Sequence, residues 1–102
     1  MGQHRYARVY CADGFNMSVQ AHDGAYCKPR ENNASRYDEV EVGFPSDEES
    51  LLMDYCEDRK DPTGTIYAYV PVQVVTNVIA KHGGMVDGDA PPGIAQLKAS
   101  SR

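Results

Sequence analysis

Three cysteines and three histidines share a chain of only 102 residues, which raises the question of a metal site. Structural zinc sites draw their ligands in pairs, with two to four residues between cysteines or three to five between histidines. The nearest approach to such a pair is His22 and Cys27, with four residues between them in a segment rich in turn formers. Because no pair has zinc-finger spacing, we expect no bound metal and no disulfide, and Cys11–Cys27 is the pairing to check first.

Nucleophilic catalysis is the second chemistry that these residue types suggest. Lys28 and Arg30 would lower the pKa of the neighbouring Cys27 thiol, but no motif supplies a histidine base for it. His82 falls in the last turn of a predicted helix, where a histidine is typical of a cap for free carbonyl groups. The two glycines that follow it come after a helix end, whereas anions bind at helix N-termini. We therefore expect no enzyme, no catalytic residue and no cofactor.

The charge distribution argues against nucleic acid as a partner. The chain has 15 acidic residues against 10 Lys and Arg, a net charge of −5, and ten of the acids fall within residues 37–61. Binding to a phosphate backbone needs a basic surplus instead. No stretch approaches the ~18 apolar residues of a membrane span, and an odd number of cysteines favours a reducing compartment. We expect a cytoplasmic protein that binds neither nucleic acid nor membrane.

Alternation and turn signals predict the strands that would position these side chains. Residues 5–12 and 15–21 flank Asp13-Gly14, a pair typical of a two-residue type I′ hairpin. That register pairs Tyr10 with Met17, and its buried face holds Tyr6, Tyr10, Phe15, Met17 and Val19. Residues 22–36 are predicted to form a loop, and residues 37–44 and 65–70 alternate as two further strands.

Two helices complete the prediction. Ser46 and Glu49 form a capping box that predicts a helix over residues 47–58. Pro71 suits the first turn of a second helix, which Gly83 ends. The apolar arc of that helix consists of Val72, Val74, Val75, Val78, Ile79 and His82.

The resulting order, β-β-β-α-β-α, predicts an α+β fold with an antiparallel four-stranded sheet and both helices on one face. A chain of this length is enough for one core, so we expect a single domain over residues 1–86. Residues 87–102 contain only Ile94 and Leu97 as large apolar groups, too few to offset the entropy of ordering. They are predicted to form a flexible C-terminal tail.

Three stretches of the sequence carry a family resemblance: CADGFNMSVQAHDGAYCKPR, YDEVEVGFPSDEESLL and YVPVQVVTNVIAKHGG. They resemble small uncharacterised accessory proteins of tailed phages and prophages, over residues 6–86. The resemblance is one of segment order and includes no catalytic motif. It implies a non-virion protein in the cytoplasm of a bacterial host, and it identifies no functional residue.

The first functional hypothesis is a small binding module without catalysis. Alternation places Tyr67 and Tyr69 on the sheet face opposite the helices, together with Glu39, Glu41 and Tyr37. Tyrosine is enriched at interfaces, so we expect a host protein with a basic rim, or a second copy of the chain, to cover this face. The alternative is that the hairpin or loop 22–36 covers both rings and makes them core residues.

The second hypothesis is a protein that sequesters a small anionic ligand or nucleotide. Loop 22–36 carries three cations, Lys28, Arg30 and Arg36, which would hold the anionic groups. The sequence names neither the ligand nor the partner.

Overall fold

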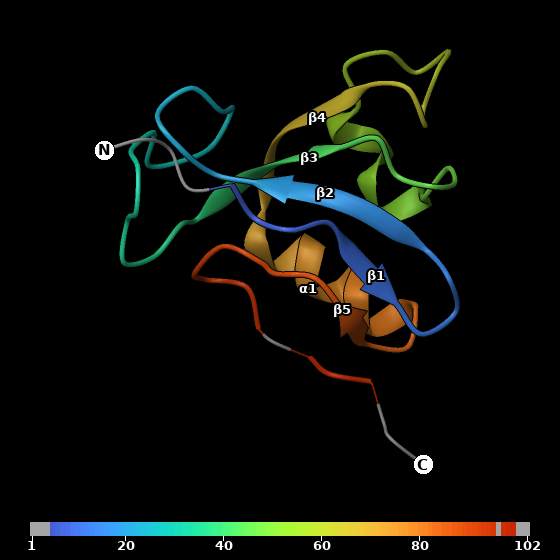
Figure 1. The fold of residues 1–102 in the computed structure, drawn as a ribbon. Helices are drawn as coiled ribbons and strands as arrows, with labels where there is room; N and C mark the ends of the chain where they lie inside the picture. The colour runs from blue at the N-terminus through green and yellow to red at the C-terminus, as the bar shows by residue number, and fades with distance from the viewer. Residues whose placement is uncertain (1–4, 96, 100–102) are drawn as a thin grey trace.

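A computed structural model describes residues 5–95 and 97–99 of the chain and has an α+β architecture (Figure 1). Its elements are β1 (Val9–Cys11), β2 (Asn16–Gln20), β3 (Glu39–Gly43), the 3₁₀ helix η1 (Ser50–Tyr55), β4 (Ile66–Pro71), α1 (Val72–Lys81) and β5 (Met85–Asp87). The strands form one antiparallel sheet in the order β4-β3-β2-β1-β5. Helix α1 lies against one face of the sheet and also contacts η1.

The core is one cluster of buried side chains contributed by the sheet and by both helices. In α1, Val75, Val78 and Ile79 are fully buried, which confirms the predicted apolar arc of this helix. Gly83 follows it with a φ of 91°, a conformation that favours glycine and ends the helix as predicted. No helix in the described part of the chain meets the length and hydropathy of a membrane span.

The predicted four-stranded sheet is wrong, because residues Met85–Asp87 form a fifth strand. This strand pairs with β1 and places Met85 opposite Cys11. Three residues are too few to show an alternation, and Gly84 and Gly88 on either side give the segment the composition of a loop.

The helix predicted over residues 47–58 is shorter and of a different type. The 3₁₀ helix η1 begins after Glu49, whose side chain accepts a hydrogen bond from the Leu51 amide at 2.9 Å. Ser46, the predicted cap, bonds instead to Asn16: its amide donates to the Asn16 carbonyl at 2.8 Å, and its hydroxyl accepts from the Asn16 amide at 3.0 Å. The segment before η1 is thus fastened to the start of β2.

The register of the β1–β2 hairpin differs by one residue from the prediction. Val9, rather than Tyr10, lies opposite Met17. The turn has three residues: the Gly14 amide donates to the Cys11 carbonyl, and the Cys11 amide donates to the Phe15 carbonyl. A one-residue slip turns every side chain of a strand to the other face. Val9 and Cys11 are therefore buried, whereas Tyr10, predicted in the core, is 42% exposed.

A β-bulge in β4 overturns the predicted exposure of Tyr67. Val40 of β3 pairs with Val70 and Val42 pairs with Tyr67. One residue lies between the two positions on β3, whereas two residues lie between their partners on β4. The extra residue lets Tyr67 and Val70 both face the core, where they are fully buried. Tyr69, at a φ of 53°, points outward.

The prediction for Tyr37 is also wrong, because this residue precedes β3 and is fully buried. Its hydroxyl donates to the Glu31 carbonyl at 2.6 Å and accepts from the Ala34 amide at 3.2 Å. The side chain therefore holds loop 22–36 in place. Burial of both Tyr67 and Tyr69 was the alternative prediction, and the structure buries Tyr67 and leaves Tyr69 41% exposed.

The segment after β5 contacts the rest of the fold. The Tyr37 amide donates to the Pro92 carbonyl at 2.9 Å, and Ile94 belongs to the core cluster. Leu97 and Ala99 form backbone hydrogen bonds with Met85 of β5. Residue 96 and residues 100–102 of the predicted tail lie outside the described residues, and the flexibility of the tail stays a prediction.

Candidate functional site

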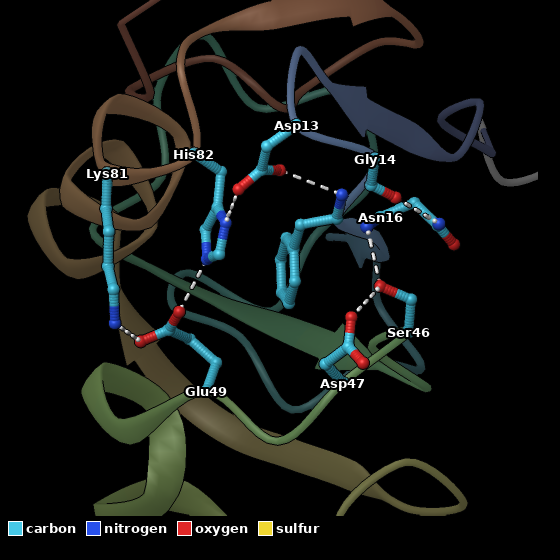
Figure 2. Close-up of polar contacts among 9 residues, drawn as sticks. Asp13, Gly14, Asn16, Ser46, Asp47, Glu49, Lys81 and His82 are labelled. Atoms are coloured by element: carbon cyan, nitrogen blue, oxygen red, sulfur yellow. Dashed lines mark hydrogen bonds and ion pairs between the residues drawn. The ribbon is translucent and has the colours of Figure 1, made fainter.

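A group of charged side chains joins three segments that are far apart in the sequence (Figure 2). Asp13 lies in the β1–β2 turn, Glu49 precedes η1, and Lys81 and His82 end α1. Two backbone hydrogen bonds hold the turn against the helix end: the Ala12 amide donates to the Gly84 carbonyl, and the Asp13 amide to the His82 carbonyl. We call Asp13, Glu49, Lys81 and His82 the charge cluster.

The His82 ring lies between two carboxylates. Its Nδ1 atom is 2.6 Å from Oδ2 of Asp13, and its Nε2 atom is 2.6 Å from Oε1 of Glu49. Lys81 donates from Nζ to the second oxygen of Glu49 at 2.8 Å. Figure 2 shows these three contacts as a chain that runs from the turn, through the ring, to the lysine.

Glu49 is a buried acid, with 2% of its surface exposed. Its carboxylate receives hydrogen bonds from Lys81, from His82 and from the Leu51 amide. Burial alone raises the pKa of a carboxyl group, but these donors outweigh burial and lower the pKa of Glu49 below its ordinary value. The buried charge of Glu49 is therefore paired and hydrogen-bonded, as buried charges must be.

The pKa values of Asp13 and of the His82 ring are shifted in opposite directions. The Phe15 amide, followed by His82, lowers the pKa of Asp13 through hydrogen bonding. Burial acts to lower the pKa of His82, but the hydrogen bonds and charges of Glu49 and Asp13 raise it above 6.5. All these shifts favour the ionised forms of the three groups.

The Phe15 ring covers one face of the imidazole. The two ring centroids are 4.1 Å apart with an angle of 12° between the planes, so the rings are stacked. Phe15 is buried and follows the turn that carries Asp13. Stacking on an aromatic face favours a cationic ring and fixes its orientation between the carboxylates.

The chemistry open to this cluster is limited by its own contacts. Both ring nitrogens of His82 are engaged by carboxylate oxygens, so neither is free to bind a metal or to activate a nucleophile. Within residues 5–95 and 97–99, no group of three His, Cys, Asp or Glu side chains has a metal-binding arrangement. The cluster is an ionic clamp between three segments.

The cysteines show no sign of activation. Cys11, Cys27 and Cys56 are all unpaired, and the first two are buried. Burial raises the pKa of the Cys27 thiol, in spite of the opposing charge of Arg30. His22 and Cys27 meet through the backbone, since Sγ of Cys27 donates to the His22 carbonyl at 3.2 Å.

A second candidate site lies at the other end of β2, where loop 22–36 crosses to the bulge of β4. The Tyr69 amide donates to the Tyr26 carbonyl at 3.1 Å, and the two ring centroids are 5.8 Å apart. Each tyrosine is 41% exposed. The Arg30 guanidinium lies 5.9 Å from the centroid of the Tyr26 ring. We call Tyr26, Tyr69 and Arg30 the aromatic surface.

The aromatic surface combines residues from two separate sequence hypotheses. Tyr69 was expected in a partner-binding face and Arg30 in an anion-binding loop. Glu39 and Glu41 are half-buried on β3, as expected for the face opposite the core. Lys28 and Arg36 are exposed, and the Lys28 backbone pairs with Glu39.

Sequence reasoning missed the partners of both sites. Tyr26 gave no signal, because it lies in a loop without periodicity. Asp13 was interpreted as a turn former and Glu49 as part of a capping box. Each side chain accepts a hydrogen bond from a nearby backbone amide and also contacts the ring of His82. The one available signal was a histidine on an otherwise apolar helical arc, which needs polar partners once it is buried.

Comparison with known proteins adds no relative. No protein-family model matches the chain, and no significant similarity to a curated protein or to a solved structure was found.

Proposed function

We propose that the chain is a small non-catalytic binding module that engages another protein through its aromatic surface. The observation that carries the proposal is the side-by-side exposure of Tyr26 and Tyr69, with the Arg30 guanidinium beside Tyr26. Tyrosine and arginine are the residue types most enriched among binding hot spots. The resemblance to phage accessory proteins makes a bacterial host protein the partner that we propose.

The backbone of Tyr69 supports this reading of the surface. A non-glycine residue with a φ of 53° is held in the left-handed region, at a cost of about 1–2 kcal/mol. Such strain persists where the surrounding structure imposes it, and it is concentrated at functional positions. Here the bulge and the hydrogen bond to Tyr26 impose it and aim a large aromatic ring into solvent.

The charges around the aromatic surface suggest the nature of the partner. Glu39 and Glu41 lie half-exposed on β3, and the whole chain carries a net charge of −5. A partner that presents basic groups around an apolar centre would complement this distribution. The acidic surroundings disfavour stacked nucleic-acid bases, which need several cations beside the aromatic rings.

The test compares exposed tyrosines of equal accessibility. Immobilised wild-type protein and a Tyr26→Ala/Tyr69→Ala variant are incubated with bacterial lysate, and bound proteins are identified by mass spectrometry. Tyr10→Ala is the matched control, since Tyr10 is 42% exposed but lies on β1. A specific partner should bind the wild type and the control, and its affinity for the double variant should fall at least ~30-fold, equivalent to about 2 kcal/mol.

Two outcomes would contradict the proposal. In one, the folded double variant keeps full affinity for every captured protein. In the other, Tyr10→Ala weakens capture as much as the double variant does.

The alternative function is sequestration of a small anionic ligand by Lys28, Arg30 and Arg36. No pocket is found among the described residues, so no observation favours this alternative.

A further inference from the structure

The contacts of His82 define the protonation state of its ring. A neutral imidazole has one N–H group and one lone pair. If His82 were neutral, that lone pair would face a carboxylate oxygen at 2.6 Å, because both ring nitrogens have such an oxygen at this distance. Only the imidazolium form donates to Asp13 and Glu49 at once.

The proton belongs to the ring rather than to a carboxyl group. Asp13 also accepts from the Phe15 amide at 2.9 Å, and Glu49 also accepts from the Leu51 amide and from Lys81. These donors stabilise both carboxylates in their charged form. The lowered pKa values of the two acids and the raised pKa of His82 agree with this assignment.

We propose that protonated His82 is a pH-dependent lock that fastens the β1–β2 turn and the start of η1 to the end of α1. The ring joins Asp13, 69 residues away, to Glu49, 33 residues away. Loss of the ring proton removes one donor and leaves a lone pair against a carboxylate. The lock is therefore closed while the ring is protonated and loosens when the ring is deprotonated.

Within the described residues, the ionisable groups that contact the ring are two carboxylates, and both favour its protonated form. Asp13 approaches from the turn and Glu49 from the segment before η1, while Lys81 of α1 reaches the ring only through Glu49. The Phe15 ring, which does not titrate, covers the stacked face. Two carboxylates therefore hold the proton on the ring, and Lys81 compensates part of their negative charge.

Linkage gives the direction and the steepness of the response. The contribution of His82 is complete below 6.5, the ordinary pKa of the open ring, and is lost as the pH rises through the raised pKa of the closed ring. Between these two values, opening releases one proton, so the open fraction grows up to tenfold per pH unit and then reaches a plateau. At the acid end, Asp13 and Glu49 lose their contribution as the pH falls through their lowered pKa values.

The decisive measurement is an NMR titration of the unmodified protein. At pH 6 the ring nitrogens of His82 should both carry protons, and the midpoint of the ring titration should lie above the ordinary value of 6.5. His22 is an internal contrast, because its Nδ1 accepts from the Gly24 amide at 3.0 Å and therefore lacks a proton in that contact. Hydrogen exchange of the turn amides, corrected for the intrinsic rate, should accelerate over the same pH range as the ring titration.

Two variants test whether the ring causes the change. In His82→Gln the exchange of the turn amides should be fast and should lose this pH dependence, whereas His22→Gln should retain it. If His82→Gln does not fold, Asp13→Asn serves instead and should lower the titration midpoint of His82, since one of its two carboxylates is gone. A titration midpoint of His82 at or below 6.5, or turn amides whose protection does not follow the ring titration, would overturn the proposal.

Discussion

Replacement of Glu49 by alanine is the most demanding test of the charge cluster. Glu49 is buried and accepts hydrogen bonds from three donors. Once the carboxylate is removed, these donors differ in whether they can find another acceptor. Lys81 is half-exposed and can return to water, but the imidazolium of His82 retains only Asp13 as its partner. The amide of Leu51 loses its cap at the start of η1.

The expected destabilisation follows from these losses. Loss of a helix cap costs about 1 kcal/mol, and breaking a buried ion pair on one side costs about 3–5 kcal/mol. The two losses share one carboxylate and are not additive, so we expect Glu49→Ala to lower the free energy of unfolding by about 3–5 kcal/mol. That is a large fraction of the 5–15 kcal/mol typical of a folded domain.

Urea denaturation at pH 6, followed by circular dichroism, measures this loss. The matched control is Glu48→Ala, because Glu48 is the adjacent acid and is exposed, so its removal should change stability by less than about 0.5 kcal/mol. Glu49→Gln separates charge from volume, since it keeps the size of the side chain and loses its negative charge. A loss below about 1 kcal/mol for Glu49→Ala would refute the reasoning, because leaving even one buried donor without an acceptor costs about 1–3 kcal/mol.

Two further predictions concern the segment after β5 and the thiols. A Cβ atom at Gly93 would meet the Tyr37 carbonyl oxygen at 2.4 Å, whereas at Gly14 it would meet nothing within 4 Å, and both glycines have positive φ. In thermal denaturation, Gly93→Ala should therefore be less stable than Gly14→Ala by at least ~1 kcal/mol, and equal stability would mean that this segment is mobile, as the sequence predicts. With a thiol reagent at pH 8, Cys56 should react first because it is half-exposed, whereas burial slows the reaction of Cys11 and Cys27. Mass spectrometry of the labelled protein follows the order of reaction, and earlier labelling of Cys11 or Cys27 would contradict this prediction.

The parts of the fold that follow one uninterrupted period were predictable. Helix α1 has its apolar residues at helical spacing, a proline before it and a glycine after it. Strand β2 alternates without interruption, and its buried residues are those on the predicted face. In β3, Val40 and Val42 are buried as predicted. In each case the local pattern and the tertiary contacts require the same conformation.

The errors about which face Tyr10 and Tyr67 occupy arise where one extra residue enters the backbone. The turn after Cys11 has three residues instead of two, and β4 has a bulge before Val70. The side chains that precede each insertion lie on the face opposite to the predicted one, so Tyr10 is exposed and Tyr67 is buried. An alternating sequence predicts which side chains face the core only where the strand pairing is regular. The position of an extra residue depends on pairing with the neighbouring strand, which the local sequence does not contain.

The charge cluster was less predictable than the fold, because the three contacts among its members join residues that are 32 to 69 positions apart in the sequence. Ser46 and Glu49 match a capping box, but Glu49 is the cap and Ser46 bonds to β2. The sequence indicates a polar histidine at the end of α1 without indicating which acids approach it. The two acids meet His82 only because the hairpin turn and the segment before η1 pack against the end of α1 in the folded chain.

The two candidate sites lie at opposite ends of β2, which makes their roles separable by experiment. The charge cluster surrounds the turn before Asn16, whereas the aromatic surface follows the loop that leaves Gln20 (Figure 1). Mutations more than about 7–10 Å apart that share no partner usually have additive effects. His82→Gln should therefore loosen the hairpin turn and leave the affinity of a captured partner unchanged, and partner binding should persist at a pH where the lock is open. A partner whose affinity follows the titration of His82 would show instead that the two ends of the sheet are coupled.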